Sequence, residues 1–225
     1  MLAARTIRTA ARINTLTPLI LARGLAASHL SSLTDAIKHD HRELETYFSN
    51  ILNAKDNDTK VRWQNQLVWE LSRHAVGEEL VVYPAMDKYI SNGTAVADKD
   101  RAAHQKVKII LQDFQAMDPS DPQFEPTLKT IIADLKQHIQ DEELHDIPLL
   151  EKALANNLVE SAELAKSFER TKMFTPTRSH PAAPNKPPFE TAVGLMTAPM
   201  DKIRDMFAKF PREDTLGRRV PENAT

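Results

Sequence analysis

The stretch His74-Ala-Val-Gly-Glu78-Glu79-Leu-Val-Val-Tyr-Pro84 returns as His138-Ile-Gln-Asp-Glu142-Glu143-Leu-His-Asp-Ile-Pro148. Both copies have the form H-x3-E-E-x4-P. On an α-helix, a His and a Glu four residues apart lie within about 40° of each other, so their polar groups point into the same volume. Each copy is therefore predicted to form a chelate of one imidazole and one carboxylate.

Both chelates continue the apolar stripe of the helix that carries them. The apolar residues that precede them at steps of three and four are Trp63, Leu67 and Leu71 in the first copy and Leu128, Ile131 and Leu135 in the second. An ionised Glu on such a stripe is costly to bury unless it is paired or bound to a metal. One copy alone could be a core His satisfied by a neighbouring Glu, but two copies with the same trailing Pro favour a metal site.

The composition is that of an ordinary soluble protein. The chain has 225 residues, of which 41% are hydrophobic and 27% charged, and its net charge of -2 gives no reason to expect a nucleic-acid partner. It contains no cysteine, which excludes disulfides, thiolate nucleophiles and zinc–thiolate sites. Any metal must therefore be held by His and carboxylate side chains.

Residues 1–30 have the composition of a mitochondrial targeting segment. No acidic residue occurs before Asp35, and three arginines would line one face of a helix, namely Arg5, Arg8 and Arg12. A secretory signal is the alternative, but its apolar run would be short and interrupted by a proline. No stretch approaches the roughly 18 apolar residues of a membrane span. We expect a mitochondrial location, with the cytoplasm as the alternative.

Residues 31–157 contain four strongly periodic helical segments and no convincing strand alternation. The segments are predicted at about 32–53, 58–90, 94–117 and 124–155, with interruptions near Pro84 and Pro148. Four helices joined by short loops fold most simply as an up-down-up-down antiparallel four-helix bundle. The predicted fold class is therefore all-α.

The first and third predicted helices also carry a His on their apolar stripes. His41 lies between Ile37 and Leu44, and His104 occupies the stripe of its own helix. His39 is about 200° round the helix from His41, so both cannot face the same core. As a lone residue, each His would more often be a satisfied core or boundary histidine. Together with the two chelates, however, His41 and His104 supply one imidazole per helix.

Four imidazoles and two or more carboxylates in a bundle core suit Fe, Mn or Zn. Two metals can use so many groups better than one, particularly if Glu78 and Glu142 each bridge. Ferritin-like di-iron bundles use Glu-x-x-His instead, which is the reverse order with a shorter step. The predicted ligands are His41, His74, Glu78, His104, His138 and Glu142.

The order and placement of these residues resemble the hemerythrin-like (HHE cation-binding) family. The resemblance covers roughly residues 33–155 and rests on the pair Asp40-His41, on His104 and on the two chelates with their Glu-Glu pairs and prolines. It implies a non-heme di-iron centre in which His side chains from all four helices bind iron and carboxylates bridge. Two irons per chain and dioxygen or a related small ligand are therefore expected.

Two departures count against plain oxygen carriage. Lys108 stands where oxygen-carrying hemerythrins have a second His on the third helix, and Glu142 follows the last His by four residues where they have an Asp at five. Both departures look like the branch of the family that includes eukaryotic iron- and oxygen-responsive domains. Lys108 could form a salt bridge with a carboxylate or repel a second cation.

Further residues near the chelates are open candidates for the site. Glu45, Glu79 or Glu143 could fill a position that the missing His leaves, although a solvated helix face is the simpler expectation for each. His145, three residues after Glu142, could orient a ligand.

The sequence does not separate a sensor, a store, a carrier and an enzyme. The favoured function is a di-iron protein that binds or senses dioxygen, a related small molecule or iron itself. One alternative is a di-iron enzyme that reduces peroxide or nitric oxide. The other is a helical interaction module whose metal site has lapsed.

Three further segments follow the bundle. Residues 158–174 are predicted as an additional helix, 175–188 as a stiff, extended Pro-rich linker, and 189–225 as a tail with a short amphipathic helix. The apolar face of that last helix comprises Met200, Ile203, Phe207 and Phe210. Since this helix cannot bury itself, it is expected to dock on its own bundle, in a partner groove or on a membrane surface.

Overall fold

The long helices begin at side chains that cap their free backbone N–H groups. In the computed structural model, which describes residues 32–186, 189–213 and 219–220, Ser32 accepts from the N–H of Asp35 at the start of α1 (Leu33–Asn53). Asp56 accepts from the N–H of Thr59 at the start of α2 (Asn57–Gly77). Asn157 caps α7 (Leu158–Lys172) in the same way. Short polar residues before an apolar stripe therefore mark these starts.

The remaining elements follow the predicted order of segments. They are η1 (Glu78–Val82), α3 (Tyr83–Tyr89), α4 (Gly93–Phe114), α5 (Phe124–Asp141), η2 (Glu142–Asp146), α6 (Ile147–Leu154) and α8 (Phe189–Asp205). Two strands of two residues each, β1 (Arg212–Glu213) and β2 (Arg219–Val220), pair antiparallel with Arg212 opposite Val220.

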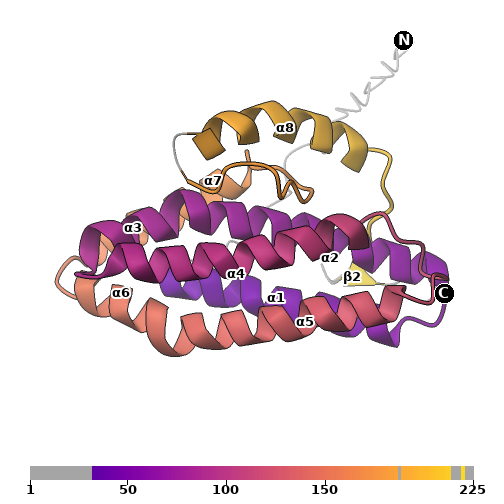
Figure 1. Cartoon of the computed structure of the whole chain (residues 1–225), viewed down its shortest axis with the longest axis horizontal. Coiled ribbons are helices and arrows are strands. Elements are labelled where there is room, and N and C mark those ends of the chain that lie inside the picture. Colours follow the sequence, from indigo (N-terminus) through magenta and orange to yellow (C-terminus); the bar gives the residue numbers. More distant parts are fainter. Residues whose placement is uncertain (1–31, 187–188, 214–218, 221–225) are drawn as a thin grey trace, which may run out of the picture.

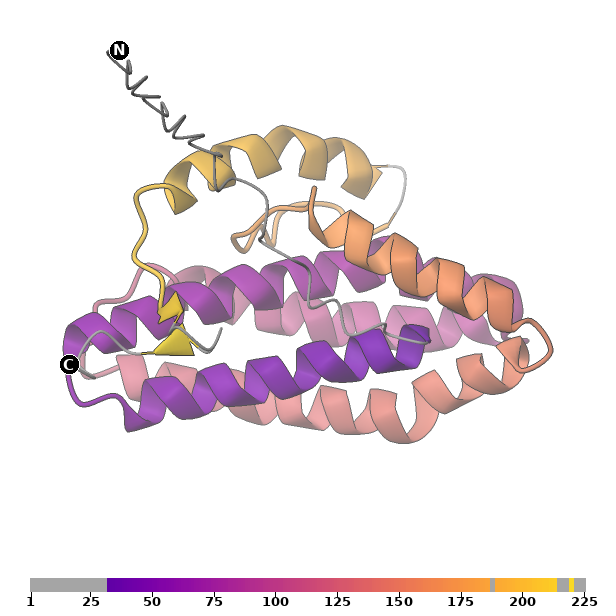
Figure 2. The same cartoon turned by 180° about the vertical axis from the view of Figure 1, so that it is seen from behind.

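The helices α1 to α6 form a four-helix bundle, in which α2 continues through η1 into α3 and α5 continues through η2 into α6 (Figure 1). Contacts between α1 and α2, between α3 and α4, between α4 and α5 and between α1 and α5 close the bundle. The additional helix α7 lies across α1 and α2 (Figure 2). The predicted all-α bundle with an extra C-terminal helix is confirmed. No helix among the described residues is long and apolar enough to span a membrane.

The two prolines of the repeated motif do not break their helices. Proline has no N–H, and its ring clashes with the carbonyl four residues earlier in a regular α-helix. In both copies the chain widens into a π-helical turn just before the proline, and the N–H of Tyr83 or Ile147 bonds to the carbonyl of Glu78 or Glu142, five residues earlier. Each helix therefore continues, but its faces are shifted by one residue.

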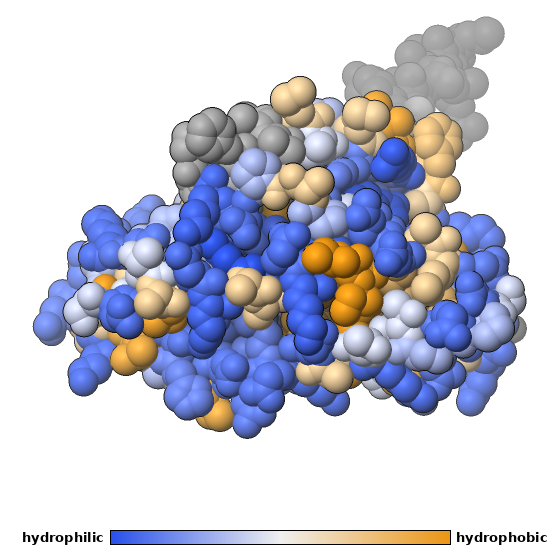
Figure 3. All heavy atoms as spheres, viewed as in Figure 1, coloured by the Kyte–Doolittle hydropathy of each residue, from blue (hydrophilic) through white to orange (hydrophobic). Residues whose placement is uncertain are grey.

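The core consists of two apolar clusters with a polar layer between them. One cluster includes Leu44 of α1 and Leu135 of α5, and the other includes Ile37 of α1 and Ile147 of α6. His41 lies on α1 between the residues of the two clusters, and the chelates occupy the same level on the other helices. The face of the bundle formed by α4 and α5 is mainly hydrophilic (Figure 3).

Two glycines allow close approaches between helices. A Cβ on Gly93 would lie 1.9 Å from the carbonyl oxygen of Met86, so α4 can start against α3 only because this residue has no side chain. A Cβ on Gly77 would lie 2.9 Å from the ring of Phe168. Gly77 therefore lets α7 pack beside the first chelate.

The C-terminal extension packs on the bundle in a way that differs from its predicted geometry. The prolines of 175–188 predict a stiff, extended spacer, whereas the described residues 175–186 form turns bonded to α4. Ser179 Oγ donates to the carbonyl of Lys108 at 2.6 Å, and Gln105 Nε2 donates to the carbonyl of Pro181 at 2.8 Å. The helix α8 lies over this segment (Figure 1). The targeting segment predicted at 1–30 lies outside the described residues.

Candidate metal centre

The structure brings the six predicted ligands together in the polar layer of the bundle. His41, His74, His104 and His138 come from α1, α2, α4 and α5, and Glu78 and Glu142 begin the two π-helical turns. All six side chains are buried. His39, by contrast, is exposed on the other side of α1, as the stripe argument predicts.

Each of the two glutamates contacts imidazoles from two helices. Glu78 Oε2 lies 3.4 Å from Nε2 of His74, its partner in the chelate, and 3.3 Å from Nε2 of His104. Glu142 lies 3.4 Å from Nε2 of His138 and 3.4 Å from Nε2 of His41. Both carboxylates are thus placed to bridge between pairs of histidines.

These contacts define two groups of potential ligand atoms that share Glu78. In the His41 group (His41, His74 and Glu78) and in the His138 group (Glu78, His104, His138 and Glu142), the ligand atoms lie within 4.8 Å of one another. The Nε2 atoms of His104 and His138 are 2.9 Å apart, so they converge on a common point. Four imidazoles with shared carboxylates form a ligand set suited to two transition-metal ions.

The hydrogen bonding of the site fits bound cations. Five atoms that face the centre of the layer make no hydrogen bond: Nε2 of His41 and His74, both carboxylate oxygens of Glu78, and Oε2 of Glu142. Buried polar atoms without hydrogen bonds are rare in folded proteins, and buried charges are normally paired or bound to metal. The atoms without hydrogen bonds are the ones that metal coordination would use.

In three of the four imidazoles, the Nδ1 atom, which faces away from the centre of the layer, contacts an outer carboxylate. The Nδ1 atom of His41 lies 2.8 Å from Glu143, that of His74 lies 3.1 Å from Asp40, and that of His104 lies 3.3 Å from Glu79. Such a contact fixes the ring and directs the other nitrogen, Nε2, toward the centre of the polar layer. The second Glu of each Glu-Glu pair therefore supports a His on a neighbouring helix.

Each outer carboxylate is in turn paired with a cation. Arg42 bonds to Glu143, Lys108 bonds to Glu79, and Lys172 lies 2.6 Å from Asp40. Burial raises the pKa of Asp40, but His74 and Lys172 outweigh this effect and lower it to about 2. The Asp40 carboxylate therefore stays ionised and able to hold His74.

A third cluster of carboxylates has its own cation. Asp40, Glu43 and Glu70 lie close enough together to bind a metal ion. Lys172 Nζ, however, is 3.6 Å from Glu70 as well as bonded to Asp40, and its side chain is buried at the end of α7. The ammonium group supplies positive charge to this cluster, and Arg73 also pairs with Glu70, so α7 contributes to the polar layer through Lys172.

Two residues of the layer were not predicted. The Tyr83 hydroxyl lies 3.1 Å from Nε2 of His104 and 3.5 Å from Glu142. Because the π-helical turn places residue i+5 over residue i, Tyr83 lies over Glu78, a position that a regular helical stripe does not predict.

Asp100 is fully buried, and neither of its carboxylate oxygens makes a hydrogen bond. The sequence could have indicated Asp100, because it lies four residues before His104, and the His and Glu of each chelate are also four residues apart.

The open candidates divide into two kinds. Glu79 is fully buried, so the solvated face expected for it is wrong, and Glu143 is only 18% exposed. Glu45 is partly exposed, with 38% of its side chain accessible, and is paired with Arg42, as a solvated face predicts. His145 is also exposed, so the expectation that it orients a ligand is wrong. Of the two roles open to Lys108, the structure shows the salt bridge, with Glu79 as its carboxylate.

The buried charges perturb the pKa values of the histidines. Burial lowers the pKa of His41, but the nearby carboxylate of Glu142 outweighs burial and raises it to about 9. Burial is likewise outweighed at His104, where Glu78 and Glu79 raise the pKa to about 10. Burial lowers the pKa of His138. Burial and the charge of Glu142 raise the pKa of the Asp100 carboxyl to about 8.

These shifts predict how the stability of the metal-depleted protein depends on pH. In the folded protein the pKa values of His41 and His104 lie above the value of 6.5 that is usual for an unfolded chain. Protonation of these two histidines therefore stabilises the fold fully below pH 6.5, and the stabilisation is lost as the pH rises toward 9 to 10. Asp100, whose pKa is raised from 3.8 to about 8, changes stability in the same direction. Thermal unfolding followed by circular dichroism should therefore give a melting temperature that falls from pH 6.5 to pH 9.5.

The metal-loaded protein is the control for this prediction. Bound cations require neutral imidazoles and replace the protons as the source of positive charge, so the loaded protein should lose much less stability over the same range. Equal slopes for the loaded and depleted proteins would contradict this account of the buried charges.

Comparison with known proteins agrees with this geometry. Residues 32–150 match the family model described as the hemerythrin HHE cation binding domain. A hemerythrin-like protein of Schizosaccharomyces pombe is 53% identical over 188 residues, which cover 83% of this chain and 92% of that protein. No solved structure gives a significant match.

A DNA nickase of a Nostoc species is a more distant relative. It is 25% identical over 127 residues, which cover 56% of this chain but only 34% of the nickase. The similarity is therefore confined to a part of that protein. With the family model extending over more than half of the chain, the predicted resemblance is confirmed, and the chain belongs to the hemerythrin HHE cation-binding domain family.

Proposed function

We propose that the protein holds two non-heme irons in the bundle and uses them to bind dioxygen or a related small ligand. Membership of a cation-binding family supports a metal site of some kind. The more specific parts of the proposal, that the metal is iron and that each chain holds two ions, rest on the number and type of the His and Glu side chains in the layer. The single observation that carries the proposal is that the His41 group and the His138 group share Glu78.

Each donor group would hold one iron. Imidazole nitrogens and carboxylate oxygens suit iron, and Mn or Zn would be the alternatives for the same ligands. Iron bound there would supply a redox-active centre for a small ligand. The chain's own contribution is to orient the donors, because Asp40, Glu79 and Glu143 hold three imidazoles from behind.

The space beside the centre supports a small ligand. A cavity of about 10 Å³ adjoins His104, and most of its other lining residues are apolar, including Leu71, Ala75 and Val107. A cavity of this size holds about one water molecule, so it suits a diatomic molecule better than an organic substrate. A second cavity of about 30 Å³ shares Ser72 and Lys108 with the first and is covered by the 176–184 segment. The two cavities together support a route for a small ligand from the surface.

The proposal predicts that the purified protein binds about two Fe per chain. Replacing His74 or His138 by Ala removes half of a chelate and should lose at least one Fe, since a metal site with one ligand fewer binds much more weakly. His39→Ala is the matched control, because His39 is exposed on the same helix as His41 and should leave the iron content unchanged. Metal analysis by mass spectrometry, normalised to protein concentration, measures the effect.

Circular dichroism of the same variants would show whether they remain folded. If the folded wild-type protein takes up no iron, manganese or zinc, the alternative of an interaction module with a lapsed metal site would replace this proposal. If His39→Ala loses as much iron as His74→Ala, the donor assignment would be wrong.

A second candidate function, reduction of peroxide or nitric oxide, is favoured by Tyr83. Its buried hydroxyl lies within reach of both His104 and Glu142. Burial and the charge of Glu78 raise the pKa of Tyr83 well above its usual value, so the phenol stays protonated. A protonated hydroxyl beside the irons could supply a proton to a bound ligand. Lys108 is a weaker candidate, because its ammonium group is bonded to Glu79.

The two candidates differ in turnover. If the protein only binds its ligand, the optical spectrum of the reduced, iron-loaded protein should change with dioxygen and recover when dioxygen is removed, without iron-dependent consumption of peroxide or nitric oxide. If it is an enzyme, consumption should follow the iron content, and Tyr83→Phe should slow it at least about tenfold while keeping the ring and the iron. Turnover that Tyr83→Phe leaves unchanged would remove the role of this hydroxyl.

We also propose a mitochondrial location. The support is the cationic face predicted for Arg5, Arg8 and Arg12 and the lack of acidic residues before Asp35. A tagged full-length chain should colocalise with mitochondria, and mass spectrometry of the native protein should find an N-terminus after Arg23. Retention of Met1 together with a cytosolic signal would contradict the location without affecting the metal centre.

A further inference from the structure

The helix α8 packs against the protein through the face that carries its acids. The Asp201 carboxylate, 1% exposed, accepts from the backbone N–H groups of Thr177 and Arg178 at 3.2 Å each and from Nε2 of His180 at 2.8 Å. Asp205 pairs with the guanidinium of Arg178 at 2.9 Å. Among the described side chains of α8, these acids therefore provide polar and charged contacts that hold the helix in place, together with the buried apolar side chain of Ala198.

The opposite side of α8 exposes large apolar side chains. More than half of the surface is exposed in each of five residues on the helix and the turn that follows it: Met196, Met200, Ile203, Met206 and Phe207. Met200, Ile203 and Phe207 of the predicted apolar face therefore point into solvent, whereas Phe210, the fourth residue of that face, is only partly exposed. Single exposed apolar residues are common on protein surfaces, but a contiguous group of them marks an interaction site.

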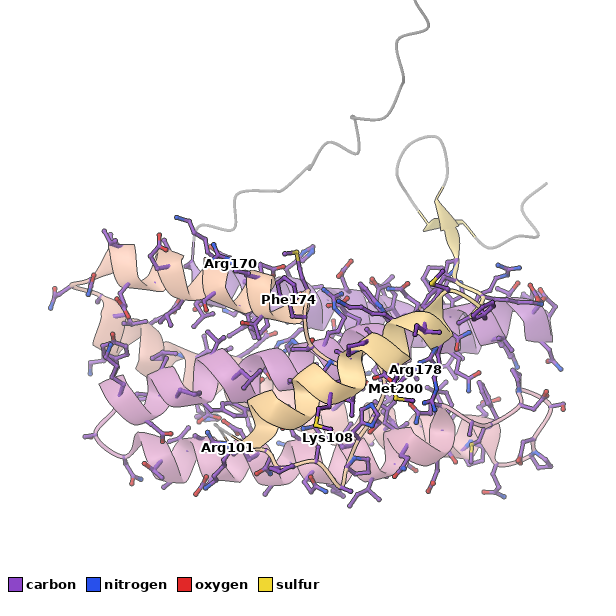
Figure 4. All side chains as sticks on the ribbon, turned by 90° about the horizontal axis from the view of Figure 1, so that it is seen from above. Arg101, Lys108, Arg170, Phe174, Arg178 and Met200 are labelled. Atoms are coloured by element: carbon purple, nitrogen blue, oxygen red, sulfur yellow. The ribbon has the colours of Figure 1, made fainter. Side chains whose placement is uncertain are left out.

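This apolar group extends to the end of α7. Met173 and Phe174 are both more than half exposed. Lys202 joins them to α8, because its ammonium group donates to the carbonyl of Met173 at 2.7 Å and lies 5.6 Å from the centre of the Phe174 ring. Figure 4 looks down on this side of the molecule, with Phe174 and Met200 labelled. We call these seven apolar residues together with Lys202 and Arg204 the α8 surface.

The charges of α8 are arranged around its apolar strip. At about 100° per residue, Met196, Met200 and Ile203 fall within an arc of about 60°. Lys202 and Arg204 lie on the two sides of this arc, and both are exposed. The acids Asp201 and Asp205 lie on the opposite side, where Asp201 pairs with His180 and Asp205 pairs with Arg178. Within 196–210, the surface that faces outward is thus an apolar strip with cationic edges.

We propose that the α8 surface docks this protein on a membrane that contains anionic lipids. A helix with an apolar strip flanked by cations lies in the plane of the membrane, with its apolar side chains among the acyl chains and its cations at the headgroup phosphates. Each cation near an anionic surface adds to the attraction. Since α8 is held to the bundle by its acidic face, the whole protein would be carried to the membrane surface.

The cations of the α8 surface favour a membrane over a second copy of the chain as the partner of this surface. If two α8 surfaces packed together, Lys202 and Arg204 of one copy would meet the same cations of the other. Asp201 lies 4.0 Å from Arg204 of its own chain, but Asp201 is buried and Asp205 is paired with Arg178, so neither acid could pair with the cations of a second copy. An anionic bilayer offers negative charge along the whole strip. The metal centre takes no part in this inference, so the two can fail independently.

Vesicle flotation with the full-length, iron-loaded protein tests the proposal. The wild-type protein should float with phosphatidylcholine vesicles that contain phosphatidylserine, float less with phosphatidylcholine alone, and lose binding as salt is raised. The double variant Ile203→Glu, Phe207→Glu should bind at least about tenfold more weakly, because two large apolar side chains no longer enter the bilayer. Arg204→Gln should reduce binding to the anionic vesicles only.

Leu158→Glu is the matched control, since Leu158 is 75% exposed but belongs to the first turn of α7 rather than to the α8 surface. It should float like the wild-type protein. Iron content and circular dichroism should be the same for all variants. The proposal would be overturned if the folded wild-type protein does not float with anionic vesicles, or if Leu158→Glu weakens flotation as much as the double variant. It would also be overturned if light scattering shows a dimer that the double variant abolishes while vesicle binding is absent.

Discussion

The burial of two ionisable glutamates in the middle of the bundle is the constraint on which the rest of the structure depends. Glu78 and Glu142 lie between two apolar clusters, where an uncompensated carboxylate is costly. Positive charge must therefore be supplied within the same layer, either by protonated His41 and His104 or by bound cations. This requirement supports the proposed exchange of protons for metal ions, because the apolar clusters on both sides keep bulk water from providing the compensation.

The π-helical turns explain how one motif supplies both the ligands and their supports. With the extra residue per turn, the first Glu of each pair faces the centre while the second reaches a His on a neighbouring helix: Glu79 reaches His104, and Glu143 reaches His41. The prolines favour this geometry because they cannot donate the N–H that a regular α-helix requires. The third support, Asp40, depends on Lys172 of α7, which connects a helix outside the bundle to the orientation of His74.

Much of the fold and the inner part of the site could be predicted from the sequence, because both follow from helical periodicity. The apolar stripes with their polar caps predict the helices to within a few residues, and the six predicted ligands lie on those stripes. Tyr83 and the burial of Glu79 were missed because the π-helical turns shift the phase of the stripe. The orientation of α8 could not be predicted either. Among its described side chains, Asp201 docks on the 177–180 segment, while the large apolar residues Met200, Ile203 and Phe207 stay exposed.

Anomalous X-ray diffraction at the iron absorption edge, from crystals of the iron-loaded protein, tests the central claim most directly. The account predicts two iron peaks per chain, one in the His41 group and one in the His138 group, with the carboxylate of Glu78 between them. A single peak in the polar layer, or iron bound only to the cluster of Asp40, Glu43 and Glu70, would contradict the account.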